Sequence, residues 1–378
     1  MLRCLPVLIV LCFTSLVAAQ YRSDSWFPIV KDGKAGYIDR AGNIVIEPQF
    51  DGASYFSEGL ARVSFGRDTI ITKGFSQGFI DETGKVVIQP QWDVVSHFSE
   101  GLAAVGYDQT KQKVEINGRF LGYTSASHTW YRWGFINKRG EMVIEPKFTD
   151  VSEFRDGVAA AGMTVMSEWK MGFINTKGEW IIPPKFDDTN QFSDGLARIF
   201  IDDRYGYIDG NGKIVIEPQY SSAADFSEGL ACVQIGGDVL RPKGMSVVRN
   251  HGKYVFIDRS GKVVIRLKNA RCRSFSEGLA SFEEFGKYGV GFIDHSGKIV
   301  IKPFGDGQSE FSDGLKFVIL DGGKLGYITK AGALAIQLPF GKADDFYRGL
   351  AEVCESYDVG APCGYIDKQG KVIWPLTK

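Results

Sequence analysis

The sequence is poor in the residues and motifs that identify most enzymes and nucleic-acid-binding proteins. Only four of its 378 residues are histidines, and neither an HExxH motif nor a glycine-rich phosphate loop occurs. Runs of like charge are also missing, since 44 basic residues nearly cancel 45 acidic ones. We therefore expect no catalytic residue, no cofactor, no metal and no nucleic-acid partner.

Long apolar segments are scarce as well. The one extended run, residues 5–17, follows Arg3 and ends with Val17, Ala18 and Ala19 before Gln20. A membrane-spanning helix needs about 20 apolar residues, whereas this shorter pattern is typical of a secretory signal peptide. We therefore predict a signal peptide over residues 1–19. The mature chain is expected to be secreted or periplasmic, with no membrane span after cleavage.

One short motif, in contrast, occurs again and again. Gly36-Tyr37-Ile38-Asp39 returns, with small changes, at positions 78, 134, 172, 206, 255, 291, 326 and 364. A second block, Phe-Ser-Glu-Gly-Leu-Ala, starts at Phe56, and in the eight units that carry both blocks the two marker positions are 23 residues apart. The step between units varies from 34 to 56 residues, so the insertions fall at one place in the repeat.

Each unit has the composition of three short strands. Tyr37-Ile38 and residues 44–46 are rich in β-branched and aromatic side chains, and Asp39 and Gly42 between them suit a type I turn with a glycine bulge. Pro48 is expected to end the second strand, and residues 60–63 to form the third. A calcium loop at these turns is not favoured, because only one carboxylate repeats in each of them.

These motifs resemble the WG repeat, also called KWG, of bacterial proteins. The resemblance covers nearly all of residues 26–375, although the Trp before the marker Gly is found only at Trp133. It implies a β-rich repeat domain, often exported and variable in copy number. It implies neither a defined catalytic activity nor a fixed ligand.

We therefore predict an all-β fold in which residues 20–378 form a single array of nine WG-type repeats. Stacked units can bury aromatic columns that one unit cannot bury alone. We expect an open β superhelix, because a variable copy number suits an array without a closure condition. The alternative is a closed, propeller-like ring, in which residues 26–30 would complete a blade begun by residues 364–374.

Four cysteines remain after the signal peptide, at positions 232, 272, 354 and 363, and none lies in a CxxC motif. Export permits disulfides. Cys354 ends the third-strand stretch of the eighth unit, and Cys363 precedes the marker of the ninth. We predict a Cys354–Cys363 disulfide, because pairing of these strands would bring the two Cβ atoms within reach. Whether Cys232 pairs with Cys272 stays open.

The longest insertion, residues 106–132, carries the candidate ligand-binding side chains. They are aromatic residues beside polar ones, a combination that glycan and peptide sites use: Tyr107, Phe120, Tyr123, Trp130 and Tyr131. The other interpretation is a longer hairpin in which Trp130 and Tyr131 continue an aromatic column.

The function that these features favour is an exported binding or scaffolding protein, not an enzyme, with a protein or a glycan as its partner. The alternatives are a structural envelope component or a hydrolase with paired carboxylates, although no particular pair stands out in the sequence.

Overall fold

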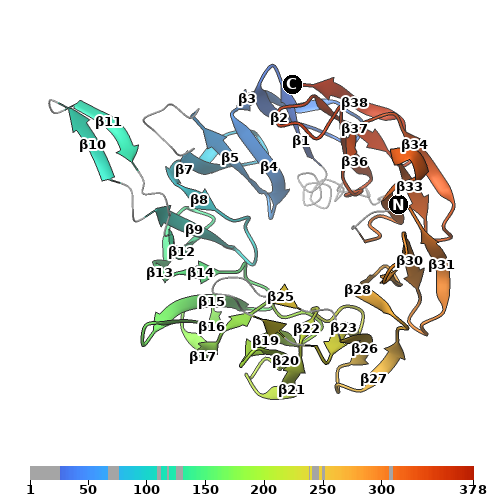
Figure 1. The fold of residues 1–378 in the computed structure, drawn as a ribbon. Helices are drawn as coiled ribbons and strands as arrows, with labels where there is room; N and C mark the ends of the chain where they lie inside the picture. The colour runs from blue at the N-terminus through green and yellow to red at the C-terminus, as the bar shows by residue number, and fades with distance from the viewer. Residues whose placement is uncertain are drawn as a thin grey trace, which may run out of the picture.

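A computed structural model describes residues 26–66, 76–108, 112–116, 119–124, 131–237, 239–240, 247–248, 252–305 and 310–378. These residues form nine small antiparallel sheets arranged in a ring, a nine-bladed β-propeller (Figure 1). Two further two-stranded hairpins extend from blades three and six. The fold is all-β, as predicted.

The strands of blades one to four are as follows. Blade one contains β1 (Phe27–Lys31), β2 (Lys34–Ile38) and β3 (Ile44–Phe50); blade two contains β4 (Gly52–Ser57), β5 (Leu60–Phe65), β6 (Ser76–Ile80) and β7 (Val86–Trp92). Blade three contains β8 (Val94–Val95), β9 (Leu102–Asp108), β12 (Tyr131–Asn137) and β13 (Met142–Phe148), with the hairpin β10 (Gln112–Ile116) and β11 (Arg119–Thr124) inserted in it; blade four contains β14 (Asp150–Val151), β15 (Val158–Val165), β16 (Glu168–Asn175) and β17 (Trp180–Phe186).

Blades five to nine complete the ring. Blade five contains β18 (Asp188–Thr189), β19 (Ala197–Ile201), β20 (Arg204–Ile208) and β21 (Ile214–Tyr220); blade six contains β22 (Ser222–Ala223), β23 (Leu230–Ile235), β26 (Lys253–Asp258) and β27 (Val263–Arg266), with the hairpin β24 (Val239–Leu240) and β25 (Val247–Val248). Blade seven contains β28 (Ala270–Ser276), β29 (Leu279–Glu284), β30 (Val290–Ile293) and β31 (Ile299–Phe304); blade eight contains β32 (Leu315–Ile319), the 3-10 turn η2 (Asp321–Gly323), β33 (Leu325–Thr329) and β34 (Leu334–Leu338); blade nine contains β35 (Lys342–Ala343), β36 (Leu350–Cys354), β37 (Cys363–Asp367) and β38 (Val372–Thr377).

A blade is not the same segment of chain as a repeat unit. In blade two, the inner strands β4 and β5 come from the first unit, and the outer strands β6 and β7 come from the hairpin of the second. The same division holds around the ring, so each unit bridges two neighbouring sheets. The covalent chain therefore ties each blade to the next from blade one to blade nine.

The expectation of an open superhelix is wrong, and the alternative of a closed ring is confirmed. Each pair of adjacent sheets encloses its own buried apolar cluster. A ninth cluster joins the two ends of the chain, with Phe27, Ile29 and Ile38 of blade one against Leu350 and Tyr365 of blade nine. Blades one and nine lie side by side in Figure 1.

The closing arrangement also differs from the one foreseen for a ring. Residues 26–30 do not complete a blade with residues 364–374, because β1 pairs with β2 of its own unit. The hairpin of the ninth unit pairs instead with β36, where the register sets Val353 opposite Gly364. Blade nine therefore has four strands already, and the junction between blades nine and one, called the closure seam below, is held by side-chain packing.

The hairpin predicted at each marker is present. In the first unit, Asp39 Oδ1 accepts hydrogen bonds from the N–H groups of Ala41 (2.8 Å) and Asn43 (2.9 Å), and Gly42 has a φ of 86°. Gly36 is required for a different reason: a Cβ there would lie 2.6 Å from the Ile46 carbonyl oxygen of the neighbouring strand. The repeated Asp and Gly residues thus shape the backbone.

Pro48 does not end its strand, contrary to expectation. It lies inside β3, between the paired positions Ile46 and Phe50, where the register shifts. The prolines at positions 90, 146, 184 and 218 lie likewise within β7, β13, β17 and β21. These strands form the outer edge of their blades, so the missing N–H costs no ladder hydrogen bond.

The aromatic columns are the cores between blades. At each of the eight internal junctions, the Tyr or Phe of a marker packs against the Phe of the second block, with ring centroids 4.7–5.1 Å apart. Tyr37 and Phe56 form the first of these pairs, and both are buried. Among the described residues, no helix has the length and apolarity needed to cross a membrane.

Candidate functional site

The turn of the second block links neighbouring blades through two repeated hydrogen bonds. The serine hydroxyl donates to the carbonyl of the next Phe in the ring, as Ser57 does to Phe98 at 2.6 Å. The following acid accepts from the backbone of the next turn, as Glu58 does from the N–H groups of Glu100 (2.7 Å) and Gly101 (3.0 Å). The recurring acidic residues therefore have a structural role.

These links recur at five further internal junctions, between blades three and four and from blade five to blade nine. The same serine bond is made by Ser99, Ser193, Ser227, Ser276 and Ser312. The same acid-to-glycine bond is made by Glu100, Asp194, Glu228, Glu277 and Asp313. The repetition provides a reference against which any departure can be recognised.

At the closure seam the motif departs from this pattern. Tyr347 and Arg348 stand where the other turns have mostly Ser and an acid. Tyr347 packs on Tyr55, with ring centroids 5.0 Å apart, and the Arg348 guanidinium lies 5.0 Å from the Tyr347 ring centroid. At the seam, aromatic contacts thus replace the serine and acid hydrogen bonds that link most of the other turns.

The seam also lacks the Phe of the second sequence block, which packs on the marker ring at each internal junction. Among the described residues, blade one has no short inner strand ahead of β1 to supply it. The marker ring Tyr365 packs instead on Phe27, with centroids 5.5 Å apart, and its hydroxyl donates to the Pro28 carbonyl at 2.8 Å. Phe27 thus takes the place that the second-block Phe has at the internal junctions.

A pocket of about 480 Å³ lies at the seam. Its apolar wall is formed mainly by Ile29, Ala35, Ala53, Tyr365 and Trp374. Its size is in the range of ligand-binding cavities, roughly 300–1,000 Å³.

Trp374 also differs from the residue that the other units have at the same repeat position. The eight other units have a buried Ile at its position. Trp374 Nε1 donates to Thr377 Oγ1 at 3.0 Å, and Thr377 in turn donates to the Val30 carbonyl across the seam. This chain of bonds fixes the indole ring in the pocket wall.

The polar group of the pocket is Glu352. It stands where other units have Arg62 and Arg198, each of which donates to a carbonyl on the inner strand of the next blade. Burial raises the pKa of the Glu352 carboxyl above its usual range, and the negative charge of Asp344 and a hydrogen bond to the Asp344 side chain raise it further, against the opposing charge of Lys342. Glu352 is thus an acid held at the edge of an apolar pocket.

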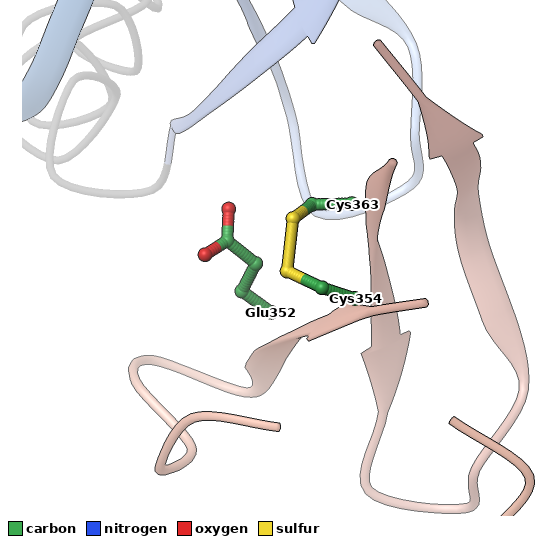
Figure 2. A group of neighbouring side chains, drawn as sticks. All are labelled: Glu352, Cys354 and Cys363. Atoms are coloured by element: carbon green, nitrogen blue, oxygen red, sulfur yellow. A yellow bond between two sulfur atoms is a disulfide. The ribbon is translucent and has the colours of Figure 1, made fainter. Parts of the chain in front are cut away.

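The Cys354–Cys363 disulfide lies beside Glu352. The register of β36 and β37 sets Cys354 directly opposite Cys363, and Figure 2 shows the bridge and the Glu352 carboxylate next to each other. The ligand atoms of these three residues lie within 4.8 Å of one another, but the bridge engages both sulfurs. We therefore treat the group as part of the pocket wall and propose no metal there. The structure also joins Cys232 to Cys272, which the sequence left open.

A second hollow, of about 740 Å³, lies next to the turns near the seam. Tyr55, His97, Glu153 and Tyr347 line it together with Asp344. His97 Nδ1 lies 3.7 Å from Glu153 Oε1, and the backbone N–H of His97 donates to the same oxygen at 3.3 Å. The Asp344 backbone N–H donates to the Glu352 carbonyl at 2.9 Å, so a residue of this hollow contacts a residue of the first pocket.

The residues predicted as a ligand site do not contribute to the seam pocket. Tyr107 is exposed, and Tyr131 packs on Trp133 with centroids 5.9 Å apart. Phe120 and Tyr123 lie on β11, in the hairpin that projects from the ring in Figure 1, but their side chains are outside the described residues, as is all of Trp130. The aromatic-loop hypothesis therefore stays a prediction.

A Gly-x-Ser-x-Gly sequence occurs at residues 74–78, the pattern of a hydrolase nucleophile. Ser76 is the first residue of β6, and Gly78 is a marker glycine in the middle of that strand. A nucleophile elbow needs a turn from a strand into a helix, whereas β6 is followed by its hairpin with β7. The sequence is therefore a coincidence of the repeat.

Comparison with solved structures finds several similar chains. BamB from Moraxella catarrhalis is 10% identical with a TM-score of 0.40, over 86% of this chain and 92% of that one. Apo AztD from Citrobacter koseri is 11% identical with a TM-score of 0.38, over 92% of each chain. Prolyl oligopeptidase B from Galerina marginata is 10% identical with a TM-score of 0.44, over 76% of this chain and 51% of that one.

Sequence comparison with curated proteins finds no match. The family model of the WG-containing repeat, in contrast, matches residues 36–66, 78–109, 133–163, 171–205, 205–237, 256–288 and 291–303. These matches follow the units defined above and cover more than half of the chain. The protein belongs to the WG-containing repeat family.

Proposed function

We propose that this protein is an exported binding scaffold that holds a protein or glycan ligand at its closure seam. The observation that supports this proposal is the gathering of repeat departures around one pocket: Tyr347, Arg348, Glu352 and Trp374 all differ from the other units and all lie at the seam. Closure by packing alone would be served by the apolar residues used elsewhere in the ring. An acid and an indole on a pocket wall suit recognition.

Export is supported by the signal-like segment and by the two disulfides, which persist in oxidising compartments. The test is amino-terminal sequencing of the protein recovered outside the cytoplasm. A mature chain starting at Gln20 is expected, and an uncleaved chain would contradict this part of the proposal.

The hydrolase alternative has one candidate pair, Asp344 and Glu352. Glycoside hydrolases separate their two carboxyl groups by roughly 5 Å or more, so that a sugar carbon or a water fits between them. Asp344 directly follows β35 and Glu352 lies on the neighbouring strand β36, and the negative charge of Asp344 helps to raise the pKa of the Glu352 carboxyl. No observation places a substrate between these two groups, so we do not propose catalysis.

The binding proposal is tested with the mature chain, residues 20–378, on a glycan array and against candidate envelope proteins. The seam variant is Trp374→Ile, which restores the residue of the other units, and the matched control combines Tyr107→Ala with Tyr131→Ala on the insertion. Loss of at least tenfold in affinity for the seam variant alone, with unchanged circular dichroism, is expected. Loss in the insertion variant alone would place the site on the insertion, and no loss in either would favour a structural role.

A further inference from the structure

We propose that the seam pocket recognises an ammonium group carried on an apolar body. This inference rests on the proposed function and adds the chemical class of the ligand. It starts from Glu352, whose side chain faces a pocket that is otherwise largely apolar. Among the described residues, no ion pair within 4.0 Å is formed by this carboxylate.

Two other units have an arginine at the position of Glu352, and their hydrogen bonds can be compared with the surroundings of Glu352. At the same position, the Arg62 guanidinium donates at 2.9 Å to the Val95 carbonyl of blade three, and the Arg198 guanidinium donates to the Ala223 carbonyl of blade six. At the seam the next blade has no inner strand among the described residues, so an Arg would face no such carbonyl. The residue there is a carboxylic acid, and none of the ion pairs within 4.0 Å among the described residues gives it a cation.

The surroundings of Glu352 favour a cation over a neutral donor. Burial and Asp344 both disfavour the ionised carboxyl, and a cation bound next to it would reverse that effect. The charged groups around this acid are Asp344, whose negative charge raises the Glu352 pKa, Lys342, which lies 3.4 Å from Asp344, and Lys378, which also lines the pocket. The two lysines are partly or fully exposed.

The remaining walls suit an apolar body next to the charge. The register places Glu352 opposite Tyr365, and Tyr365 opposite Trp374, so the acid and two rings line one face of blade nine. Aromatic faces attract a nearby cation and pack well against a flat or aliphatic stem. Ile29 and Ala53 close the other side of the pocket.

Two sources can supply this chemistry: a free small amine, or a lysine side chain of a partner protein. The test uses isothermal titration of the full mature chain with 2-phenylethylamine, with its neutral counterpart 2-phenylethanol and with its anionic counterpart 3-phenylpropanoate. A second arm uses acetyl-Gly-Lys-Gly-amide and the same peptide with an acetylated lysine side chain. The arm that binds more tightly identifies the source.

The ammonium probe of either arm is expected to bind at least tenfold more tightly than its uncharged counterpart. Glu352→Gln should abolish this difference, whereas Glu153→Gln, a control in the neighbouring hollow, should leave it unchanged. Ammonium binding should also weaken on acidification, as Glu352 becomes protonated.

Equal affinity for charged and uncharged probes, or a charge preference that survives Glu352→Gln, would overturn the inference. The same holds if no ammonium probe binds at all. The proposed function is judged separately, because Trp374→Ile would still abolish binding of the ligand found on the arrays.

Discussion

The eight internal junctions and the closure seam solve the same packing problem in different ways. An internal junction uses a buried aromatic pair and, between most blades, a hydroxyl and a carboxylate bonded to the next turn. The seam joins residues from the two ends of the ring, such as Phe27 with Tyr365 and Tyr55 with Tyr347. It uses side chains that occur once at their repeat positions, such as Trp374 and Tyr347. The repeated contacts hold the ring together. At the seam, where the repeat pattern is interrupted, different side chains can form a binding site.

The closure seam leaves a pocket between its two blades, but it is still held by several contacts. Besides its apolar cluster, it has the Tyr365 hydroxyl bonded to the Pro28 carbonyl at 2.8 Å and the Gly33 N–H bonded to the Lys378 carbonyl at 3.0 Å. What it lacks is the second-block Phe that packs on the marker ring at the internal junctions. The pocket is thus a direct result of how the ring closes.

The largest expected effect is the removal of an internal Phe. Phe98 is 1% exposed and packs on Phe79, so Phe98→Ala should cost about 3–5 kcal/mol in the free energy of unfolding. At the seam, Tyr347→Ser restores the repeat residue at an exposed position and should cost less than about 1 kcal/mol. Urea denaturation followed by tryptophan fluorescence measures both, and similar losses would contradict the difference between the junctions.

The two disulfides provide the next comparison. Cys232–Cys272 joins blade six to blade seven with a sequence separation of 40, whereas Cys354–Cys363 lies within blade nine with a separation of 9. In the chain-entropy model, the longer loop contributes about 4 kcal/mol and the shorter about 2–3 kcal/mol. Double Cys→Ser variants of each pair, compared by urea denaturation, should show the larger loss for Cys232–Cys272; the reverse order would show that the seam bridge carries more of the closure.

A third comparison concerns pH. Glu310, on the inner side of blade eight, has its pKa raised to about 7 by burial, against the opposing charges of Lys316 and Arg273 and with a small further rise from Asp345. The folded state therefore holds a proton that the unfolded chain has already lost between the usual Glu pKa and about 7. Stability is fully present below this window and falls as the pH rises through it, by the order of 1–3 kcal/mol.

The Glu310→Gln variant should lose this dependence. Its stability should stay level from pH 4.5 to 7.5 where the wild-type protein declines, as measured by urea denaturation at each pH. Lys316→Ala, which restores the residue of the other units, should steepen the decline because it removes the nearest cation. A wild-type profile as flat as that of Glu310→Gln would refute the assignment.

The sequence predicted the parts of this fold that depend on neighbouring residues. The spacing of 23 residues, the Asp39 turn and the aromatic columns follow from local chemistry and all occur in the structure. Ring closure was not predictable, because it depends on the angle between adjacent blades, which no spacing records. The position of Pro48 was misjudged for a related reason, since only the assembled sheet shows that its strand is an outer edge.

The candidate site could not be predicted from the sequence for the same reason, because it exists only in the assembled ring. Trp374 in place of Ile and Glu352 in place of Arg, Phe or a small residue are visible when the units are aligned. Their meaning depends on Phe27 and Ile29 lying opposite them, at the other end of the chain. The sequence suggested the aromatic insertion as a site because its aromatic residues are close together in the chain. The residues of the seam pocket come from opposite ends of the chain, so no sequence pattern groups them.

The smallest effect, and the sharpest contrast with Glu310, is expected at Glu58. Desolvation alone would raise the pKa of this carboxyl, but hydrogen bonds from Lys138 and from the N–H of Gly101 outweigh it and lower the pKa below its usual range. Its contribution is thus present above the usual Glu pKa and is lost as the pH falls through the lowered value, which is the opposite sign to Glu310. Because Glu58 is largely solvent-accessible, screening limits this contribution to about 1 kcal/mol at most. Glu58→Gln should therefore lower stability slightly at pH 7 and not at pH 3, as measured by urea denaturation at both pH values. An equal loss at the two pH values would show that the effect does not come from the Glu58 charge.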